Sequence, residues 1–189
     1  MQIKELQESK QHLRKYIASL KSSYEKTTLL DFSETILKQL EETELFRQAS
    51  CVALYNAIPG EVQTATFLEK WYDKKQLLLP LVVGDDLRLL PYEGVDSLKP
   101  GVFGILEPAD QETTIPETDI DLIIVPGVAF DRQLNRMGRG KGYYDRLLPT
   151  LQAPKIGICF DFQLQEMIPV EPFDKKMDMI ITEKEVITG

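Results

Sequence analysis

A short run of almost continuous apolar residues, DLIIV at 121–125, constrains the fold more than any other stretch of the chain. Pro126 and Gly127 close the run, which has the pattern of a β-strand covered on both faces. Such strands are typical of parallel sheets flanked by helices. In open α/β sheets, ligands bind beyond the carboxyl ends of the strands. The segment that follows Val125 is therefore the first candidate for a functional site.

Apolar residues in the rest of the chain recur first with helical spacing and then in strand-like runs. Helices are expected at residues 6–20, 29–40, 64–74 and 142–151. Strands are expected at 51–55, 76–83, 87–92, 121–125, 155–160 and 179–182. This alternation predicts an α/β fold: a three-layer α/β/α sandwich with a mostly parallel, Rossmann-like sheet. Because the chain has no repeat or Gly/Ser linker, residues 1–189 are expected to form a single domain.

Composition and charge argue against several classes of protein. The net charge of −8 disfavours a nucleic-acid partner, because binding to a phosphate backbone usually needs a broad basic face. No apolar run approaches the length of a membrane span, and the polar beginning MQIKELQESK is not a secretory signal, so we expect a cytoplasmic protein. Cys51 and Cys159 lie in apolar runs without metal-binding spacing and are expected to pack as small hydrophobic residues.

The segment from Phe130 to Arg146 concentrates positive charge and glycine. Its five cations outnumber its two aspartates, which gives a net charge of +3; the cations are Arg132, Arg136, Arg139, Lys141 and Arg146. Glycines alternate with cations at 138–142, so backbone N–H groups and cationic side chains can converge on one anion, and a polyphosphate suits such a site. A helix beginning near Tyr143 would add its N-terminal dipole. The alternative is a solvated surface loop, and neither standard phosphate-binding signature fits.

The stretch VPGVAFDRQLNRMGRGKGYYDR at 125–146 resembles the signature of the 5-formyltetrahydrofolate cyclo-ligase family, also called 5,10-methenyltetrahydrofolate synthetase. The resemblance extends along the chain through KQHLR at 10–14, EVQT at 61–64, GILEP at 104–108 and DKKMD at 174–178. It implies an enzyme that uses ATP and Mg²⁺ to convert 5-formyltetrahydrofolate, with or without a polyglutamate tail, to 5,10-methenyltetrahydrofolate. ADP and phosphate would be released, and a monomer is expected.

The resemblance also assigns roles to residues. The ATP site would comprise Lys10, Gln11, His12, Leu13, Arg14, Arg136, Met137, Gly138, Arg139, Gly140, Lys141, Gly142, Tyr143 and Tyr144. The folate site would comprise Asn56, Glu61, Phe103 and the same residues from Gly138 to Gly142. Arg139, Lys141 and Tyr144 would be catalytic, and Asp145 and Asp178 would help to place Mg²⁺, with Asp174 as a competitor for the second position.

Most of these residues also have structural explanations. Glu61 after Pro-Gly could be a carboxylate that favours a helix N-terminus, and Asn56 could belong to turn chemistry. Lys10 and Arg14, four residues apart on one helix, could form a solvated stripe. Phe103 could pack in the core. The candidate metal ligands Asp145 and Asp178 could be helix or turn carboxylates.

The family's proposed reaction begins with attack of the formyl oxygen on the γ-phosphate, which gives an imidate-like phosphate ester. The neighbouring folate nitrogen then adds to the activated carbon, and loss of phosphate leaves the methenyl bridge. Because His12 is the sole histidine, Ser-His-Asp and Cys-His mechanisms have almost nothing to work with. Alignment of the reactants and neutralisation of phosphate charge must carry the catalysis. A related fold acting on a sugar phosphate or acyl donor without ATP, and a noncatalytic folate- or nucleotide-binding module, are the competing hypotheses.

One position departs from the family pattern. The family commonly has Gly in F-D-x-x-G-x-R, where this chain has Leu134 followed by Asn135 and Arg136. A positive φ at this position would strain Leu134. Asn135 is expected to take over the turn, because Asn tolerates the left-handed region.

Overall fold

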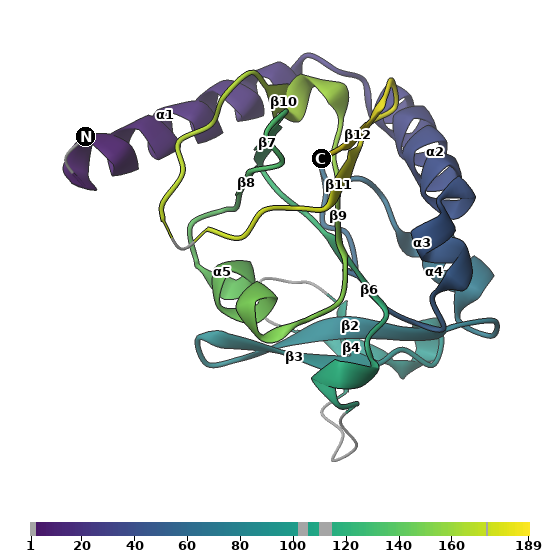
Figure 1. Ribbon diagram of the computed structural model, residues 1–189. Helices are drawn as coiled ribbons and strands as arrows, with labels where there is room; N and C mark the ends of the chain where they lie inside the picture. Colours follow the sequence, from purple (N-terminus) through teal and green to yellow (C-terminus); the bar gives the residue numbers. More distant parts are fainter. Residues whose placement is uncertain (1–2, 102–105, 110–114, 173) are drawn as a thin grey trace.

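A seven-stranded sheet forms the centre of the computed structural model, which describes residues 3–101, 106–109, 115–172 and 174–189 (Figure 1). In the described part of the chain the strand order is β12-β11-β9-β6-β1-β2-β3. The strands are β1 (Cys51–Ala53), β2 (Gln76–Val83), β3 (Asp86–Pro91), β6 (Leu122–Val125), β9 (Lys155–Ile158), β11 (Met179–Ile181) and β12 (Val186–Thr188). The five inner strands are parallel, and the edge strands β3 and β12 are antiparallel to their neighbours. The mostly parallel α/β sheet expected from the sequence is confirmed.

Alternate residues of the inner strands are buried on opposite faces of the sheet. Val52 of β1 belongs to the core beneath α2 (Lys26–Glu42), α3 (Glu44–Gln48) and α4 (Ala65–Trp71). Its neighbours Cys51 and Ala53 belong to the core on the other face, with Leu147 of α5 (Tyr143–Leu147). Burial on both faces explains why DLIIV lacks polar alternation, since all four residues of β6 are buried. Cys51 and Cys159 are buried free thiols, in agreement with the sequence analysis.

The layer on the α5 face is helical only in part. A second sheet packs there, formed by β7 (Ala129–Asp131), β8 (Arg136–Met137) and β10 (Leu164–Gln165), and the sequence analysis did not anticipate these short strands. The helix expected at 142–151 ends at Leu147 and continues as a 3₁₀ turn, Leu148–Thr150. Pro149 accounts for this change, because proline lacks the N–H that an α-helix needs and disfavours helical geometry before it.

The first helix, α1 (Ile3–Ser22), lies across the second sheet (Figure 1). Its residue Ile17 is buried against Ala129 of β7, Met137 of β8 and Ile168. α1 therefore covers the polypeptide between β6 and α5, which is the segment predicted to bind an anion. A smaller pair of strands, β4 (Leu98–Pro100) and β5 (Leu106–Pro108), completes the described strands.

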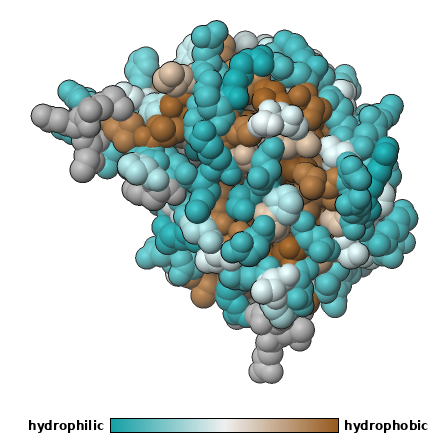
Figure 2. All heavy atoms as spheres, viewed as in Figure 1, coloured by the Kyte–Doolittle hydropathy of each residue, from teal (hydrophilic) through white to brown (hydrophobic). Residues whose placement is uncertain are grey.

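The surface seen in the same view is hydrophilic over most of its area, with hydrophobic residues gathered toward the middle (Figure 2). Among the helices of the described residues, none combines the length and the apolar character that a bilayer span requires.

The turn between β7 and β8 contains the departure from the family pattern. Leu134 itself adopts a positive φ of 68°, so the expectation that Asn135 would take over the left-handed position is wrong. The buried carboxylate of Asp131 accepts hydrogen bonds from the backbone N–H groups of Gln133 and Asn135, both at 3.0 Å, and one from the Asn135 side chain at 2.9 Å. These bonds fix the backbone on either side of Leu134. The chain therefore makes its left-handed turn at Leu134.

Candidate active site

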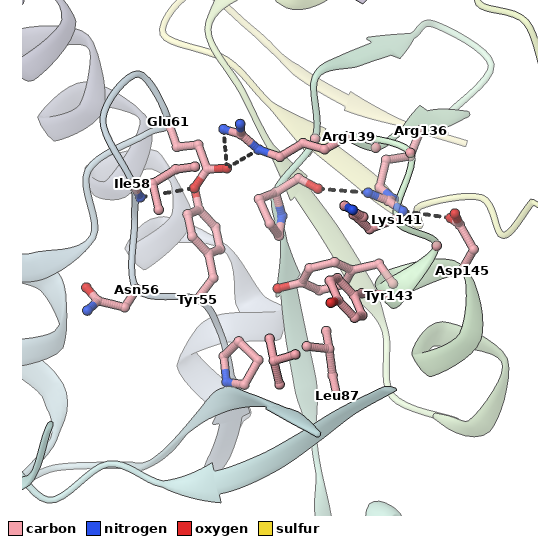
Figure 3. Close-up of a pocket in the computed structure, with 18 of the residues that line it drawn as sticks. Tyr55, Asn56, Ile58, Glu61, Leu87, Arg136, Arg139, Lys141, Tyr143 and Asp145 are labelled. Carbon is pink, nitrogen blue, oxygen red and sulfur yellow. Dashed lines mark hydrogen bonds and ion pairs between the residues drawn. The ribbon is translucent and has the colours of Figure 1, made fainter. Parts of the chain in front are cut away.

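A cavity of about 380 Å³ opens beyond the carboxyl ends of β1 and β6 (Figure 3). It is lined by Tyr55, Asn56, Ile58, Glu61, Pro80, Val82, Leu87, Leu106, Glu107, Pro126, Gly127, Arg136, Gly138, Arg139, Gly140, Lys141, Gly142, Tyr143, Tyr144 and Asp145. The cavity thus joins the turn after β1, the hairpin β2–β3 and the glycine-rich loop. It lies at the edge of the sheet where ligands of open α/β folds bind.

One wall of the cavity is apolar. Pro80 and Val82 are two residues apart on β2 and face the same side, and Leu87 pairs with Val82 across the hairpin. Tyr143, drawn close to Leu87 in Figure 3, and its neighbour Tyr144 add aromatic surface to the cavity. Such a wall suits a flat heteroaromatic ring. The sequence analysis missed these hairpin residues, although the spacing of Pro80 and Val82 within a strand was a usable signal.

The glycine-rich loop approaches α1 closely. Gly138 accepts a hydrogen bond through its carbonyl oxygen from Arg14 Nε at 3.0 Å. Gly140 has a φ of 96°, and a Cβ added there would lie 3.2 Å from Arg14 Nη2. Gly142 likewise has a positive φ, 73°, immediately before α5. The loop therefore needs glycine both for its backbone conformation and for the approach of Arg14.

Arg136 is buried at the base of the loop, with a side chain that is 4% exposed. Its Nη1 donates to the carbonyl oxygen of Pro126 at 3.1 Å, and its Nη2 donates to Asp145 Oδ1 at 2.8 Å. The guanidinium also lies 5.3 Å from the centre of the Tyr144 ring. Arg136 thus ties the end of β6 to α5, and we interpret it as a residue that positions the site rather than a freely available phosphate ligand.

Glu61 and Arg139 form an ion pair at the opposite side of the cavity (Figure 3). Glu61 Oε1 accepts from Arg139 Nη2 at 3.0 Å, while Oε2 accepts from the backbone N–H of Ile58 at 3.2 Å. The Glu61 side chain is 14% exposed and the Arg139 side chain is 53% exposed. The structure therefore brings together the carboxylate expected at the folate and a cation expected at the phosphates.

Two tyrosines of the cavity, Tyr55 and Tyr144, have pKa values shifted by their surroundings. Tyr55 donates from its hydroxyl to the carbonyl oxygen of Val62 at 3.1 Å. Burial, with the charge of Glu61 as the next cause, raises the pKa of Tyr55 and also that of Tyr144. Both phenols therefore stay neutral at physiological pH. Tyr144 can then act as a neutral hydrogen-bond donor to an oxygen in the cavity.

Lys141 is the most available cation of the loop. Its side chain is exposed and lines the cavity, and no described residue forms an ion pair or hydrogen bond with its ammonium group. An unpaired cation beside loop amides is suited to an anionic ligand.

The candidate residues of α1 divide between two sides of the helix. Lys10 forms ion pairs with Glu171 at 2.6 Å and with Asp174 at 3.4 Å. Gln11 and His12 are exposed, and neither lines the main cavity. Leu13 packs against the cluster that contains Ile17 and Met137. Of the segment from Lys10 to Arg14, Arg14 is the residue that the structure brings directly to the glycine-rich loop.

Three further candidates have different outcomes. The side chain of Met137, expected in the ATP site, is buried in the core beneath α1. Asn56 lines the cavity and donates to the carbonyl oxygen of Leu106 at 3.0 Å. Phe103 lies outside the described residues.

The structure places Asp178 away from the cavity and does not support the magnesium role expected for it. Its Oδ2 accepts from the backbone N–H of Lys155, the first residue of β9, at 2.8 Å. β9 runs parallel to β6, so Asp178 lies at the amino edge of the sheet, about 10 Å from the cavity edge at 3.3 Å per residue. Asp121 makes the same kind of contact with the N–H groups of Ser50 and Cys51. Both aspartates tie neighbouring strands together.

The remaining carboxylates fit a magnesium ion that is held largely by a nucleotide. No cluster of three or more potential ligands occurs among the residues that the structure describes. Asp145 lines the cavity and uses Oδ1 for Arg136, which leaves Oδ2 for another partner. Mg²⁺ usually takes one or two carboxylates and completes its shell with phosphate oxygens and water. Asp145 therefore has the position and the available oxygen that such an ion would require.

A cation that the sequence analysis missed lies next to the ion pair. Lys21 is partly buried near the end of α1, and a Cβ added to Gly60 would lie 3.0 Å from Lys21 Nζ. Burial lowers the pKa of Lys21, Arg139 lowers it further, and Glu61 opposes the change. Its spacing of seven residues from Arg14, two helical turns, was the signal that could have identified it.

Comparison with known proteins agrees with the geometry of the site. The family model described as the 5-formyltetrahydrofolate cyclo-ligase family matches residues 6–183. The probable 5-formyltetrahydrofolate cyclo-ligase of Schizosaccharomyces pombe is 34% identical over 174 residues, which cover 82% of this chain and 85% of that protein. The 5-formyltetrahydrofolate cyclo-ligase of Haemophilus influenzae is 29% identical, with 92% and 95% covered.

Solved structures show the same relationship. The NMR structure of Aquifex aeolicus 5,10-methenyltetrahydrofolate synthetase is similar with a TM-score of 0.86 and 37% identity, over 95% of this chain and 92% of that one. The 5,10-methenyltetrahydrofolate synthetase of Mycoplasma pneumoniae is similar with a TM-score of 0.74 and 27% identity, over 92% and 98%. This chain belongs to the 5-formyltetrahydrofolate cyclo-ligase family, enzymes that convert 5-formyltetrahydrofolate to 5,10-methenyltetrahydrofolate.

Proposed function

We propose that this enzyme couples the hydrolysis of ATP, with Mg²⁺, to the cyclisation of 5-formyltetrahydrofolate to 5,10-methenyltetrahydrofolate. The observation that carries the proposal is the composition of one cavity. A single space of about 380 Å³ has an apolar wall at Pro80, Val82 and Leu87 and a cationic glycine-rich loop facing it. A reduced pterin suits the first surface and a phosphate chain suits the second.

The pterin would bind between the hairpin wall and the tyrosines, with Glu61 as its polar anchor. Pterins carry N–H donors, and a carboxylate accepts two such bonds well. Glu61 is held in place by the N–H of Ile58, so it is oriented before substrate arrives. Asn56, at the same turn, would contact the substrate from the side of β5.

The phosphate chain would lie against the loop from Gly138 to Gly142. Arg14, Arg139 and Lys141 supply positive charge there, and Arg136 keeps the loop and Asp145 in position. A magnesium ion would neutralise charge on the phosphate oxygens and would be held by Asp145.

The reaction requires that the formyl oxygen attack the γ-phosphorus while ADP leaves with the electrons of the broken P–O bond. The resulting phosphate ester makes the formyl carbon electrophilic. The N10 nitrogen then adds to that carbon and loses its proton, and inorganic phosphate departs as the methenyl bridge forms. The protein mainly aligns the reactants and neutralises developing charge, a task suited to Arg139, Lys141 and the neutral hydroxyl of Tyr144.

The proposal is tested by following methenyl absorbance and ADP formation with purified protein. We expect both products to appear in equal amounts and only when ATP and Mg²⁺ are present. Arg139→Ala and Lys141→Ala should each lower kcat/KM by about 10²-fold or more, as removal of a transition-state donor does. Arg132→Ala is the matched control, because Arg132 is bound to Glu185 at an exposed position outside the cavity. Turnover that is unaffected by omitting ATP would contradict the proposal.

The expected monomeric state and cytoplasmic location belong to the same proposal, as does the acceptance of polyglutamylated substrate. Light scattering at assay concentrations tests the monomeric state. KM values for substrates with one and with several glutamates test the acceptance of polyglutamylated substrate.

A further inference from the structure

The face of α1 that meets the rest of the protein carries a row of three cations. Lys10, Arg14 and Lys21 are separated by four and seven residues, which places them within about 40° of one another around the helix. Each contacts a different segment of the site. Lys10 is neutralised by Glu171 and Asp174, and Arg14 donates to Gly138 of the glycine-rich loop. Of the three, Arg14 has a role in the proposed reaction and Lys10 is neutralised by its carboxylate partners, whereas Lys21 has neither.

The backbone at Gly60 makes room for Lys21. A Cβ at this position would lie only 2.7 Å from Lys21 Cδ and 3.0 Å from Nζ, and the φ of Gly60 is 84°. The stem of Lys21 is therefore packed against the turn that carries Glu61, and its direction is set by this contact. Within the described parts of the chain, no hydrogen bond or ion pair reaches its ammonium group.

Positive charge exceeds negative charge around Glu61, next to the cavity, although Lys21 itself is not among the residues that line the cavity. Glu61 is already engaged by Arg139 and by the N–H of Ile58. Lys21 interacts electrostatically with both Glu61 and Arg139, and Lys141 is also unpaired across the cavity. Two neighbouring cations that share one carboxylate repel each other, and an added anion would remove this repulsion.

We propose that Lys21 is a further substrate-binding residue, which contributes its ammonium group to anionic oxygens of the nucleotide's phosphate chain between α1, the Gly60 turn and the glycine-rich loop. The inference rests on the proposed use of ATP. Phosphate is favoured over a carboxylate of the folate's glutamate tail because Lys21 shares its helix face with Arg14, which contacts the loop.

The test compares Lys21→Met with Lys15→Met. Lys15 is an exposed lysine on the same helix, whereas Lys21 packs against the Gly60 turn, so Lys15 controls for loss of charge from α1. With saturating 5-formyltetrahydrofolate, Lys21→Met should raise the KM for ATP about tenfold and leave the KM for folate within twofold. Lys21→Arg should recover most of the loss, and Lys15→Met should resemble the wild type.

A second measurement separates this inference from the proposed function. Calorimetric titration with inorganic tripolyphosphate, without folate, should give a dissociation constant about tenfold weaker for Lys21→Met than for Lys15→Met. This comparison holds even for a protein without turnover. Equal tripolyphosphate affinities, or a KM change confined to folate, would overturn the role of Lys21 while leaving an active ATP-dependent enzyme intact. Absence of ATP-dependent turnover in the wild type would overturn the proposed function instead.

Discussion

At the scale of single residues, the left-handed conformation of Leu134 shows how tertiary contacts override local preference. A leucine at positive φ costs about 1 to 2 kcal/mol relative to its ordinary conformations. The conformation persists because Asp131 holds Gln133 and Asn135, and because the Leu134 side chain is only 8% exposed, in the core near Leu147. Burial of a leucine side chain stabilises by about 1.5 to 3 kcal/mol, which offsets the strain.

Replacement of Leu134 by glycine and by alanine tests this balance. Both variants should be less stable than the wild type, because each loses the buried side chain. Leu134→Gly should nevertheless be more stable than Leu134→Ala by about 1 kcal/mol, the reverse of the usual order, because glycine adopts positive φ without strain. Urea unfolding followed by circular dichroism measures the difference. An alanine variant more stable than the glycine variant would show that the backbone at 134 is not strained.

This residue also shows where sequence reasoning reached its limit. The pattern F-D-x-x-G-x-R located a turn that needs positive φ, and the structure confirms a turn there. Asn135 was preferred for the left-handed position from its intrinsic tolerance. The left-handed position is decided by the buried carboxylate of Asp131 and its hydrogen bonds. Its Oδ2 also accepts a hydrogen bond from the N–H of Ile168, which is far along the chain. Such a contact cannot be deduced from local residue types.

At the scale of elements, the glycine-rich loop needs glycine at position 140 both for a positive φ and for the close approach of Arg14. A comparison with Gly84 separates these two requirements. Gly140 and Gly84 both have positive φ, at 96° and 62°. A Cβ on Gly140 would meet Arg14, whereas nothing lies within 4 Å of one on Gly84. An alanine would thus be strained at both positions, but only at position 140 would its Cβ also meet the candidate phosphate site.

Gly140→Ala and Gly84→Ala should therefore differ in activity more than in stability. Each should lower the unfolding free energy by about 1 kcal/mol, since alanine is strained at positive φ. Gly140→Ala should also displace Arg14 and the loop amides and lower kcat/KM for ATP by about tenfold or more. Steady-state kinetics beside urea unfolding tests this. Equal activities of the two variants would contradict the assignment of the glycine-rich loop to the phosphate site.

The helices and strands were more predictable from the sequence than the residues that make contacts between them. Apolar periodicity located the inner strands and the long helices, because their burial pattern depends mainly on the sheet and its covering layers. The short strands β7 and β8 were missed, since two or three residues carry too little periodicity. For Asp178, sequence order shows that a carboxylate precedes a strand but not which edge of the sheet it reaches. The hydrogen bond that Asp178 accepts from the N–H of Lys155 places it at the amino edge. Lys21 was missed because the surface that it contacts is the Gly60 turn, 39 residues later in the chain.

At the scale of the whole molecule, burial keeps several weak acids protonated. Burial raises the pKa of Cys51 to about 11, with Asp121 and Asp119 as lesser causes. Burial likewise raises the pKa values of Cys159, Tyr55 and Tyr144. These groups release protons in the unfolded chain at a lower pH than in the folded protein. Above about pH 9 these groups therefore lower the stability as pH rises, while the lowered pKa of Lys21 acts in the opposite direction.

The free energy of unfolding should accordingly be constant near pH 7 to 8 and decline between about pH 9 and 11. Cys51 should contribute about 1 to 2 kcal/mol to this decline, because one pKa unit corresponds to about 1.4 kcal/mol. Cys51→Ala removes this titration and should reduce the decline by about that amount, although the variant is less stable at pH 7 through its lost packing. Urea unfolding at a series of pH values measures both curves. Parallel curves for the wild type and Cys51→Ala would show that the Cys51 thiol ionises as readily in the folded protein as in the unfolded chain, and its position between the sheet and α5 would then be open to water.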